Sequence, residues 1–351
     1  MYGHIDTCPA VVPALPAVTL YGQIVPGGPF FDDLNVGQVF DWAPAMTLTD
    51  GAAAAHQAIL GDRLRLPLDA GLSAAVTGSA RALVHPALVC DVAIGQSTLV
   101  TQRVKANLFY RGLRFHHFPQ LGDTITTRTE VVGLKQNSVK PGRPRTGLAA
   151  LRMSTVDQDG RTVLDFHRCA MLPLRDDAAD TGHADDLSTV GAGRQETPDP
   201  ARGWDADAWR AAVPGPAFGP ALAGTVWHST ADVVGSAPEL ARLTLNIAAT
   251  HHDSRVAGSR LVYGGHTIGL ALAQAVRLLP NIVTVLGWES CDHTGPVHEG
   301  DTLYSELQVE AADELPAGRG GTLQLRSLVF AVAADGPDRQ VLDWRFTVLH
   351  F

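Results

Sequence analysis

The run His251-His252-Asp253 places two imidazoles beside a carboxylate. An imidazole changes its charge near neutral pH, so it can accept and donate protons in the same reaction. Histidine and carboxylate side chains also bind zinc, but neighbouring side chains usually diverge and no third, distant ligand is evident in the sequence. The residue types therefore favour proton transfer by His251, and they leave a metal site and a loop without chemistry as the alternatives.

A second candidate is the segment 135–145, which contains four basic residues and no acidic one. Such a group can bind phosphate through charge-assisted hydrogen bonds, although the solvated tip of a hairpin is the simpler interpretation. The chain has no GxGxxG, Walker or GxSxG sequence. Nucleotide-dependent dehydrogenases, kinases and serine hydrolases are therefore poorly supported.

The elements that carry these residues are repeated along the chain. Gly-Asp-Thr occurs at residues 122–124 and again 178 residues later at 300–302, and each copy opens a stretch of alternating polar and apolar residues. This alternation is typical of strands with one buried face. Each stretch then reaches an Asp-Gly turn and returns as a closing strand, at 163–166 and 341–344. Two matching antiparallel meanders are therefore expected.

Each copy also contains one apolar segment with helical character. In the second copy it spans Gly265 to Leu279 and leaves little polar face, so this helix should be buried nearly all round. Pro280 ends it. The weaker counterpart in the first copy runs from Pro86 to Gly95, and candidate first strands precede both helices at 37–40 and 224–227. The pattern predicts a sheet wrapped around a helix, twice over.

A chain of 351 residues is longer than the ~250–300 residues that one hydrophobic core usually serves. The stretch 176–220 is rich in Asp, Ala, Gly and Pro and predicts a linker that crosses the surface. We therefore expect an N-terminal extension (1–29), an N-terminal domain (30–175), the linker (176–220) and a C-terminal domain (221–351).

Composition excludes several classes of protein. A net charge of −9 argues against a nucleic-acid partner, because phosphate-backbone binders need a dense basic face. No apolar stretch is long enough for a membrane helix, and the first twenty residues lack the Lys and Arg of a signal peptide, so the expected location is the cytoplasm. The four cysteines are far apart and are expected to be reduced and structural. They are Cys8, Cys90, Cys169 and Cys291.

The most specific similarity to a known family lies between residues 246 and 272, where His251 is followed by the run from Arg260 to Ile268. This region resembles the double hotdog proteins of the MaoC-like dehydratase, or (R)-enoyl-CoA hydratase, family. Weaker matches at 60–63, 122–124, 132–137 and 300–302 extend the resemblance over residues 30–172 and 220–350. It implies an α+β double hotdog, in which two fused hotdog domains each wrap an antiparallel sheet around a long buried helix and form an internal dimer.

The resemblance also implies an activity, namely addition of water to a 2-enoyl-CoA or the reverse dehydration of a 3-hydroxyacyl-CoA. The expected substrates are short acyl-CoAs, with branched and dicarboxylic ones such as mesaconyl-CoA included. The coenzyme A thioester is the substrate, no metal or redox cofactor is implied, and a homodimer of the double chain is a compatible assembly. A hotdog acyl-CoA thioesterase and an acyl-CoA binding protein with a decayed site remain the alternatives.

The family's fullest motif, Gly-Asp-x-Asn-Pro-x-His, is split between the two halves of this chain. In the second half the motif's His falls on His251, but its Asp position holds Asn246. In the first half the Asp falls on Asp62, but the His position holds Pro67. We therefore expect one active site centred on His251, with Asn246 orienting water, and leave open whether Asp62 joins it across the internal dimer.

Two glycines complete the implied site. Gly264 and Gly265 begin the buried helix, whose N-terminus offers unpaired N–H groups, and glycine lets a thioester approach the backbone closely. An oxyanion hole is expected there, with a tight turn as the alternative. Contacts with the acyl chain or coenzyme A are assigned to Asp253, Tyr263, His266, Lys135 and Arg143. Structural roles are the alternative for His266 and the expectation for His293.

Overall fold

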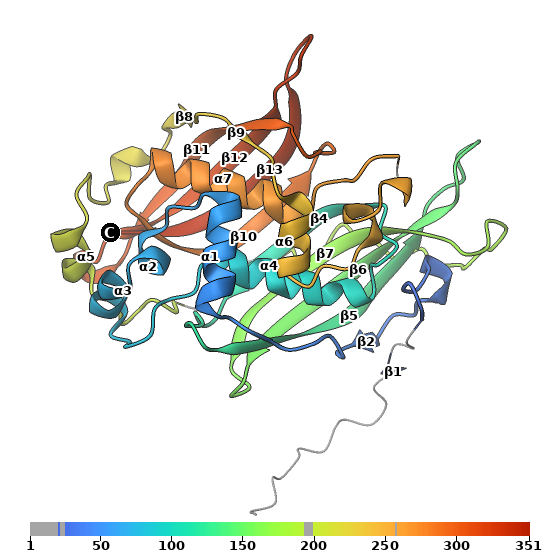
Figure 1. Ribbon diagram of the computed structural model, residues 1–351, viewed down its shortest axis with the longest axis horizontal. Coiled ribbons are helices and arrows are strands. Elements are labelled where there is room, and N and C mark those ends of the chain that lie inside the picture. Colours follow the sequence, from blue (N-terminus) through green and yellow to red (C-terminus); the bar gives the residue numbers. More distant parts are fainter. Residues whose placement is uncertain (1–19, 22–24, 193–198, 257) are drawn as a thin grey trace, which may run out of the picture.

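The computed structural model describes residues 20–21, 25–192, 199–256 and 258–351. Within these ranges one sheet of 13 strands packs against two long helices (Figure 1). The strand order is β1-β2-β5-β6-β7-β4-β10-β13-β12-β11-β8, with β3 beside β5 and β9 beside β11. The strands are β1 (Leu20–Tyr21), β2 (Gln38–Phe40), β3 (Met46–Thr47), β4 (Ala106–Phe115), β5 (Thr124–Gln136), β6 (Thr146–Asp157), β7 (Thr162–Pro173), β8 (Val226–His228), β9 (Asp232–Val233), β10 (Ile282–His293), β11 (Thr302–Glu314), β12 (Gly321–Ala331) and β13 (Arg339–His350).

The two predicted helices are confirmed as α4 (Pro86–Gln96) and α7 (Gly264–Leu278). Every residue of α4 is buried, which fits a sequence that is apolar apart from Asp91 and Gln96. Pro86 occupies the first turn of α4, where its missing N–H costs nothing, and His85 Nδ1 accepts a bond from the Ala87 N–H at 3.1 Å. The other α-helices are α1 (Asp50–Leu60), α2 (Arg65–Leu68), α3 (Ala70–Thr77), α5 (Ala206–Ala212) and α6 (Ala237–Leu243).

The two copies join edge to edge, as predicted, through the antiparallel pair of β4 and β10 (Figure 1). Arg111 of β4 and Asp292 of β10 form an ion pair of 2.7 Å across this seam. We refer to residues 30–175 as the first half and residues 221–351 as the second half. Because the seam is a continuous ladder, each half covers a sheet edge that the other would expose.

The halves repeat one another down to single hydrogen bonds. Gln96 of α4 donates to the Ile125 carbonyl at 3.1 Å, and Gln274 of α7 donates to the Leu303 carbonyl at 2.9 Å. Gln96 and Gln274 are 178 residues apart, and so are Ile125 and Leu303. The recurring aspartates behave alike as well: Asp123 accepts from the N–H three residues before it, and Asp301 does the same. Both aspartates therefore cap the turn at the start of a strand.

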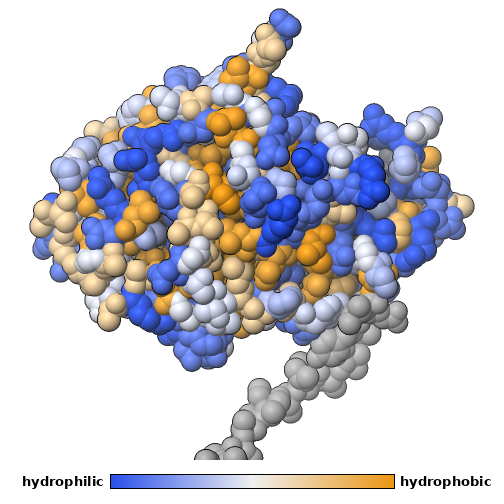
Figure 2. Space-filling view, viewed as in Figure 1, coloured by the Kyte–Doolittle hydropathy of each residue, from blue (hydrophilic) through white to orange (hydrophobic). Residues whose placement is uncertain are grey.

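Part of the segment 176–220 packs into the interior. Trp209 of α5 is 1% exposed, and its ring meets that of Phe351 edge to face. Buried apolar residues from both halves and from this segment form one continuous cluster. On the face shown in Figure 2, apolar side chains gather toward the middle and hydrophilic ones surround them. The two halves therefore share a core.

Three of the cysteines, Cys90, Cys169 and Cys291, are buried and free, as expected, whereas Cys8 lies outside the described residues. Among the helices of the described residues, none has the length and apolar character needed to cross a membrane.

Candidate active site

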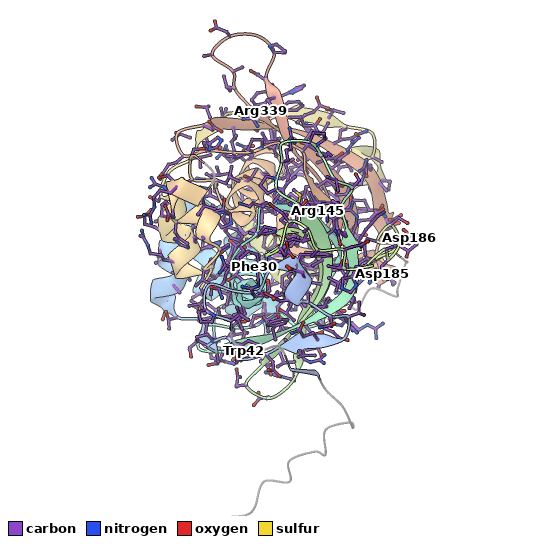
Figure 3. The ribbon with its side chains drawn as sticks, turned by 90° about the vertical axis from the view of Figure 1, so that its right-hand side faces the viewer. Phe30, Trp42, Arg145, Asp185, Asp186 and Arg339 are labelled. Atoms are coloured by element: carbon purple, nitrogen blue, oxygen red, sulfur yellow. The ribbon has the colours of Figure 1, made fainter. Side chains whose placement is uncertain are left out.

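A cavity of about 330 Å³ lies where the two halves meet. The first half contributes the start of β4 and the turn before it. The second half contributes the loop 246–251, the start of α7 and residues 293–297. Arg339, at the start of β13 and labelled in Figure 3, donates to the Pro296 carbonyl and so holds the last of these walls. We refer to this cavity as the interface pocket.

A larger hollow of about 720 Å³ lies on the sheet across the β4–β10 seam. Several of its charged side chains already have partners, such as Arg345, which pairs with Glu310 at 3.0 Å. Its lining contains no imidazole and no helix N-terminus. The interface pocket is therefore the better candidate for chemistry.

His251 ends a short 3₁₀ helix (Ala249–His251) on the wall of the interface pocket. Its Nδ1 lies 2.8 Å from the Leu261 carbonyl oxygen. A carbonyl can only accept, so Nδ1 carries the proton and Nε2 keeps a lone pair. Burial lowers the pKa of His251 to about 4, against the opposing hydrogen bond to Leu261, and electrostatic interactions with His252 and Arg168 lower it further. His251 is thus a neutral base at neutral pH.

Asn246 lines the same pocket and is held by a local turn. Its Oδ1 accepts from the Ala248 N–H at 3.0 Å, following Leu245, whose φ is 61°. Asp62 makes the same turn, because its Oδ2 accepts from the Leu64 N–H at 3.0 Å after Gly61, whose φ is 65°. The split motif thus has the same backbone geometry in both halves. Within the described residues, Asn246 Nδ2 has no protein acceptor, so it can donate to a water molecule or to substrate.

Asp62 and His251 are not brought together. Asp62 is 2% exposed and lines a separate hollow beside the end of α7. Its Oδ2 lies 2.6 Å from His85 Nε2, and since His85 Nδ1 accepts from a backbone N–H, Nε2 is the donor of this pair. Burial alone would raise the pKa of Asp62, but His85 and two backbone N–H groups more than offset it and hold the pKa below 3.8. Asp62 therefore has a partner of its own.

The start of α7 faces the pocket through Gly264. The first N–H groups of a helix have no carbonyl one turn back that could accept from them. At the start of α7, the N–H of His266 donates to the Tyr263 carbonyl at 2.9 Å. A Cβ on Gly264 would meet the ring of His293, and one on Gly265 would overlap Asp91 and Tyr263. Both glycines are thus required by neighbouring side chains of the protein itself, in addition to any close approach of a thioester.

Tyr263 lines the interface pocket and contacts the first half. It is 2% exposed and donates its hydroxyl to Asp91 Oδ1 of α4 at 3.1 Å. Burial and the Asp91 charge raise the pKa of Tyr263 well above 10, so the phenol keeps its proton. Asp91 also lies 3.2 Å from His56. A first-half carboxylate therefore positions a side chain of the second-half wall.

The other residues assigned to substrate contacts lie away from the pocket lining. His266 is fully buried, and burial lowers its pKa to about 4. Asp253 is bound by the Arg255 guanidinium, whose hydrogen bonds lower the pKa of Asp253 to about 2. Arg143 is exposed in the turn between β5 and β6. Lys135 pairs in backbone register with Ala184, in the segment that carries the Asp185 and Asp186 labelled in Figure 3.

The sequence interpretation missed Arg168 and Tyr110 and expected only a structural role for His293, yet all three line the pocket. Arg168 of β7 and Tyr110 of β4 face each other in the strand register and hydrogen-bond through their side chains. His293, at the end of β10, has an unpartnered Nε2, and burial lowers its pKa to about 4. One signal was available, since Arg168 interrupts the inward-facing alternation of Phe166 and Ala170.

Within the described part of the chain, no group of three His, Cys, Asp or Glu side chains is placed to hold a metal ion. What the pocket does offer is a neutral imidazole with a free Nε2, an amide donor and the N-terminus of a helix. These groups suit water activation next to a carbonyl whose oxygen gains negative charge.

No family model matches the chain. A conserved hypothetical protein from Mycobacterium tuberculosis, described as having a double hotdog fold, is 67% identical over 93% of this chain and 100% of that chain, with a TM-score of 0.90. A solved structure described as a MaoC domain dehydratase from Chloroflexus aurantiacus is 27% identical over 92% of this chain and 97% of that chain, with a TM-score of 0.77.

Two curated relatives match over similar lengths. Beta-methylmalyl-CoA dehydratase of Chloroflexus aurantiacus is 28% identical over 92% of this chain and 97% of that protein. Mesaconyl-CoA hydratase of Cereibacter sphaeroides is 27% identical over 85% of this chain and 88% of that protein. With the internal repeat, the seam between the two halves and these similarities in agreement, the chain belongs to the double hotdog proteins, and among them it is similar to MaoC-like dehydratases.

Proposed function

We propose that the protein is a hydro-lyase that hydrates a short 2-enoyl-CoA, or dehydrates the corresponding 3-hydroxyacyl-CoA, with branched or dicarboxylic acyl groups as substrates. The observation that carries this proposal is the free Nε2 of His251, which is fixed by the Leu261 carbonyl on the wall of the interface pocket. The names of the relatives from Chloroflexus and Cereibacter support the same chemistry.

In the hydration direction, His251 Nε2 takes a proton from water while the water oxygen forms a bond to Cβ. The π electrons move toward the thioester, and the N–H groups at the start of α7 stabilise the negative charge on its oxygen. His251 then returns the proton to Cα, so that one water molecule is added in all. Asn246 orients the water through its amide group. Only water and protons are transferred, so the proposed reaction requires no redox cofactor.

Chemical outcome separates this proposal from the alternatives. The purified protein is incubated with a panel of short 2-enoyl-CoAs, and both the enoyl thioester absorbance and free thiol are recorded. A hydratase lowers the absorbance without releasing thiol. Release of thiol would instead identify a thioesterase, and binding without either change would identify a decayed site.

A further inference from the structure

A buried cation in the interface pocket has no matching anion. Arg168 is 4% exposed and lines the pocket. It donates to the Thr101 hydroxyl and interacts with the Tyr110 side chain, both uncharged groups, while its Nε has no partner among the described residues. Among the described residues, no carboxylate lies within the 4.0 Å that would make an ion pair with it. Burying an unpaired charge is costly, so such a group points to an absent ligand.

The fold itself does not require this guanidinium. In the register of the sheet, Tyr110 of β4 faces Arg168 of β7, and in the other half Trp288 of β10 faces Phe346 of β13. Tyr110 and Trp288 are 178 residues apart, and so are Arg168 and Phe346. Phe346 is therefore the structural counterpart of Arg168. An aromatic ring fills the same place in the repeat without any charge. The cation is therefore specific to the copy of the repeat whose strands β4 and β7 line the interface pocket.

The ligand must be an anion that fits into a small cavity beside a buried side chain. The phosphates of coenzyme A are too bulky and too strongly hydrated to follow into a cavity of about 330 Å³ beside a side chain that is 4% exposed. A carboxylate on the acyl chain is small, and its two oxygens match the planar donors of a guanidinium.

On the basis of the proposed function, we propose that Arg168 binds a carboxylate on the acyl group, and that the preferred substrates are therefore dicarboxylic enoyl-CoAs. Arg168 is then the residue that determines specificity, while His251 carries the proton transfer. The geometry also supplies a competing role, because a cation in this pocket could stabilise the thioester oxygen. The two roles differ in what happens to substrates without the carboxylate.

The test uses saturated ligands, which have no double bond to hydrate and report binding alone. Dissociation constants of succinyl-CoA and butyryl-CoA, which differ in the terminal carboxylate, are measured by calorimetry for the wild type, Arg168→Met and Arg168→Lys. We expect the wild type to prefer succinyl-CoA by roughly 10- to 100-fold, the range of a charge-assisted hydrogen bond. Arg168→Met should lose this preference and keep its affinity for butyryl-CoA, with Arg168→Lys in between.

Arg128→Met is the matched control, because it removes one positive charge from an exposed position on β5 where Arg128 pairs with Glu130. This variant should retain the preference for succinyl-CoA. If Arg128→Met lost that preference, the proposal would be overturned. Equal weakening of both ligands in Arg168→Met would assign Arg168 to the thioester or coenzyme A instead. A wild type without any preference overturns the proposal even if Arg168→Met does not fold. A retained preference without hydration would refute the proposed function alone.

Discussion

His251 can act as a base because two neighbours decide its state. The Leu261 carbonyl fixes the proton on Nδ1, and burial keeps the ring neutral by lowering its pKa to about 4. The adjacent His252 is used differently, since its Nε2 lies 2.7 Å from the carbonyl of Asn246. Of the two adjacent imidazoles, only His251 lines the pocket.

Removing the base tests this directly. His251→Ala should lower kcat by roughly 10²–10⁴-fold, the usual effect of losing a positioned acid or base. The fold should survive, because His251 is not part of the buried cluster. Steady-state kinetics on the best enoyl-CoA, with the exposed His228→Ala as control, measure the effect. A loss of similar size in both variants would contradict the assignment.

Asn246→Asp restores the family's acidic residue and should leave activity at neutral pH equal or higher. The turn is compatible with a carboxylate, since Asp62 makes the same bond to a backbone N–H in the first half. A base works when unprotonated, so wild-type activity should fall as pH drops through about 4. The new negative charge should raise the pKa of His251 and move this acid limb to higher pH. If the acid limb of the pH–rate profile did not move, the new charge would not act on His251.

Asp62→Asn should affect stability and leave turnover nearly unchanged. The pair with His85 is buried and lies outside the interface pocket, and losing its charge should cost about 1–3 kcal/mol of unfolding free energy. Because folding lowers the pKa of Asp62, its contribution is present above 3.8 and is lost as pH falls through the lower folded value. Urea unfolding and kinetics measured side by side separate the two effects. A large loss of turnover would contradict this expectation and show that Asp62 takes part in the reaction.

The sequence motif could locate His251 and Asn246 because they lie only five positions apart in one short loop. Arg168 and Tyr110 could not be found in this way, because their meeting depends on the register of strands almost sixty residues apart. The pairing of Asp62 with His85, rather than with a residue of the other half, likewise depends on how α1 and α4 pack. A motif predicts local geometry, and tertiary packing decides the partners.

At the scale of elements, the apolar periodicity predicted α4 and α7 to within a residue at each end. It did not predict α1 or α6, since both are short or only partly buried and their sequences show less contrast. Yet α6 leads into the loop that carries Asn246, and this loop lies against the C-terminal end of α4. Thr98 Oγ1, just beyond α4, accepts from the Ile247 N–H at 3.1 Å. One half thus anchors the catalytic loop of the other.

Gly95→Ala tests this anchoring. A Cβ on Gly95 of α4 would overlap the Thr244 carbonyl, which belongs to the backbone and cannot rotate away. We expect a lower melting temperature and a lower kcat/KM, because relieving the overlap displaces the loop that bears Asn246. Gly51→Ala in α1 is the matched control, since its nearest side-chain atom is 3.9 Å away. Unchanged kinetics in Gly95→Ala would show that the loop is held by other contacts.

At the scale of the whole molecule, the halves depend on each other through the β4–β10 seam, the shared core and the divided pocket. Removing residues 221–351 should therefore leave an exposed edge on β4 and an aggregating first half. Size-exclusion chromatography and circular dichroism of the remaining residues 1–220 check this expectation. A soluble, folded monomer would show that the first half is stable alone.

The pseudo-symmetric counterpart of the interface pocket holds Pro67 of the first half and Phe346 and Trp288 of the second half, where the pocket has His251, Arg168 and Tyr110. Two of its polar residues, Asp62 and His85, pair with each other. Each chain should therefore take up one equivalent of acyl-CoA, although its backbone repeats twice. Within a single chain there is then no second site to respond to the first. Saturation by substrate should follow a simple hyperbola, and the pseudo-symmetry of the fold should leave no trace in the kinetics.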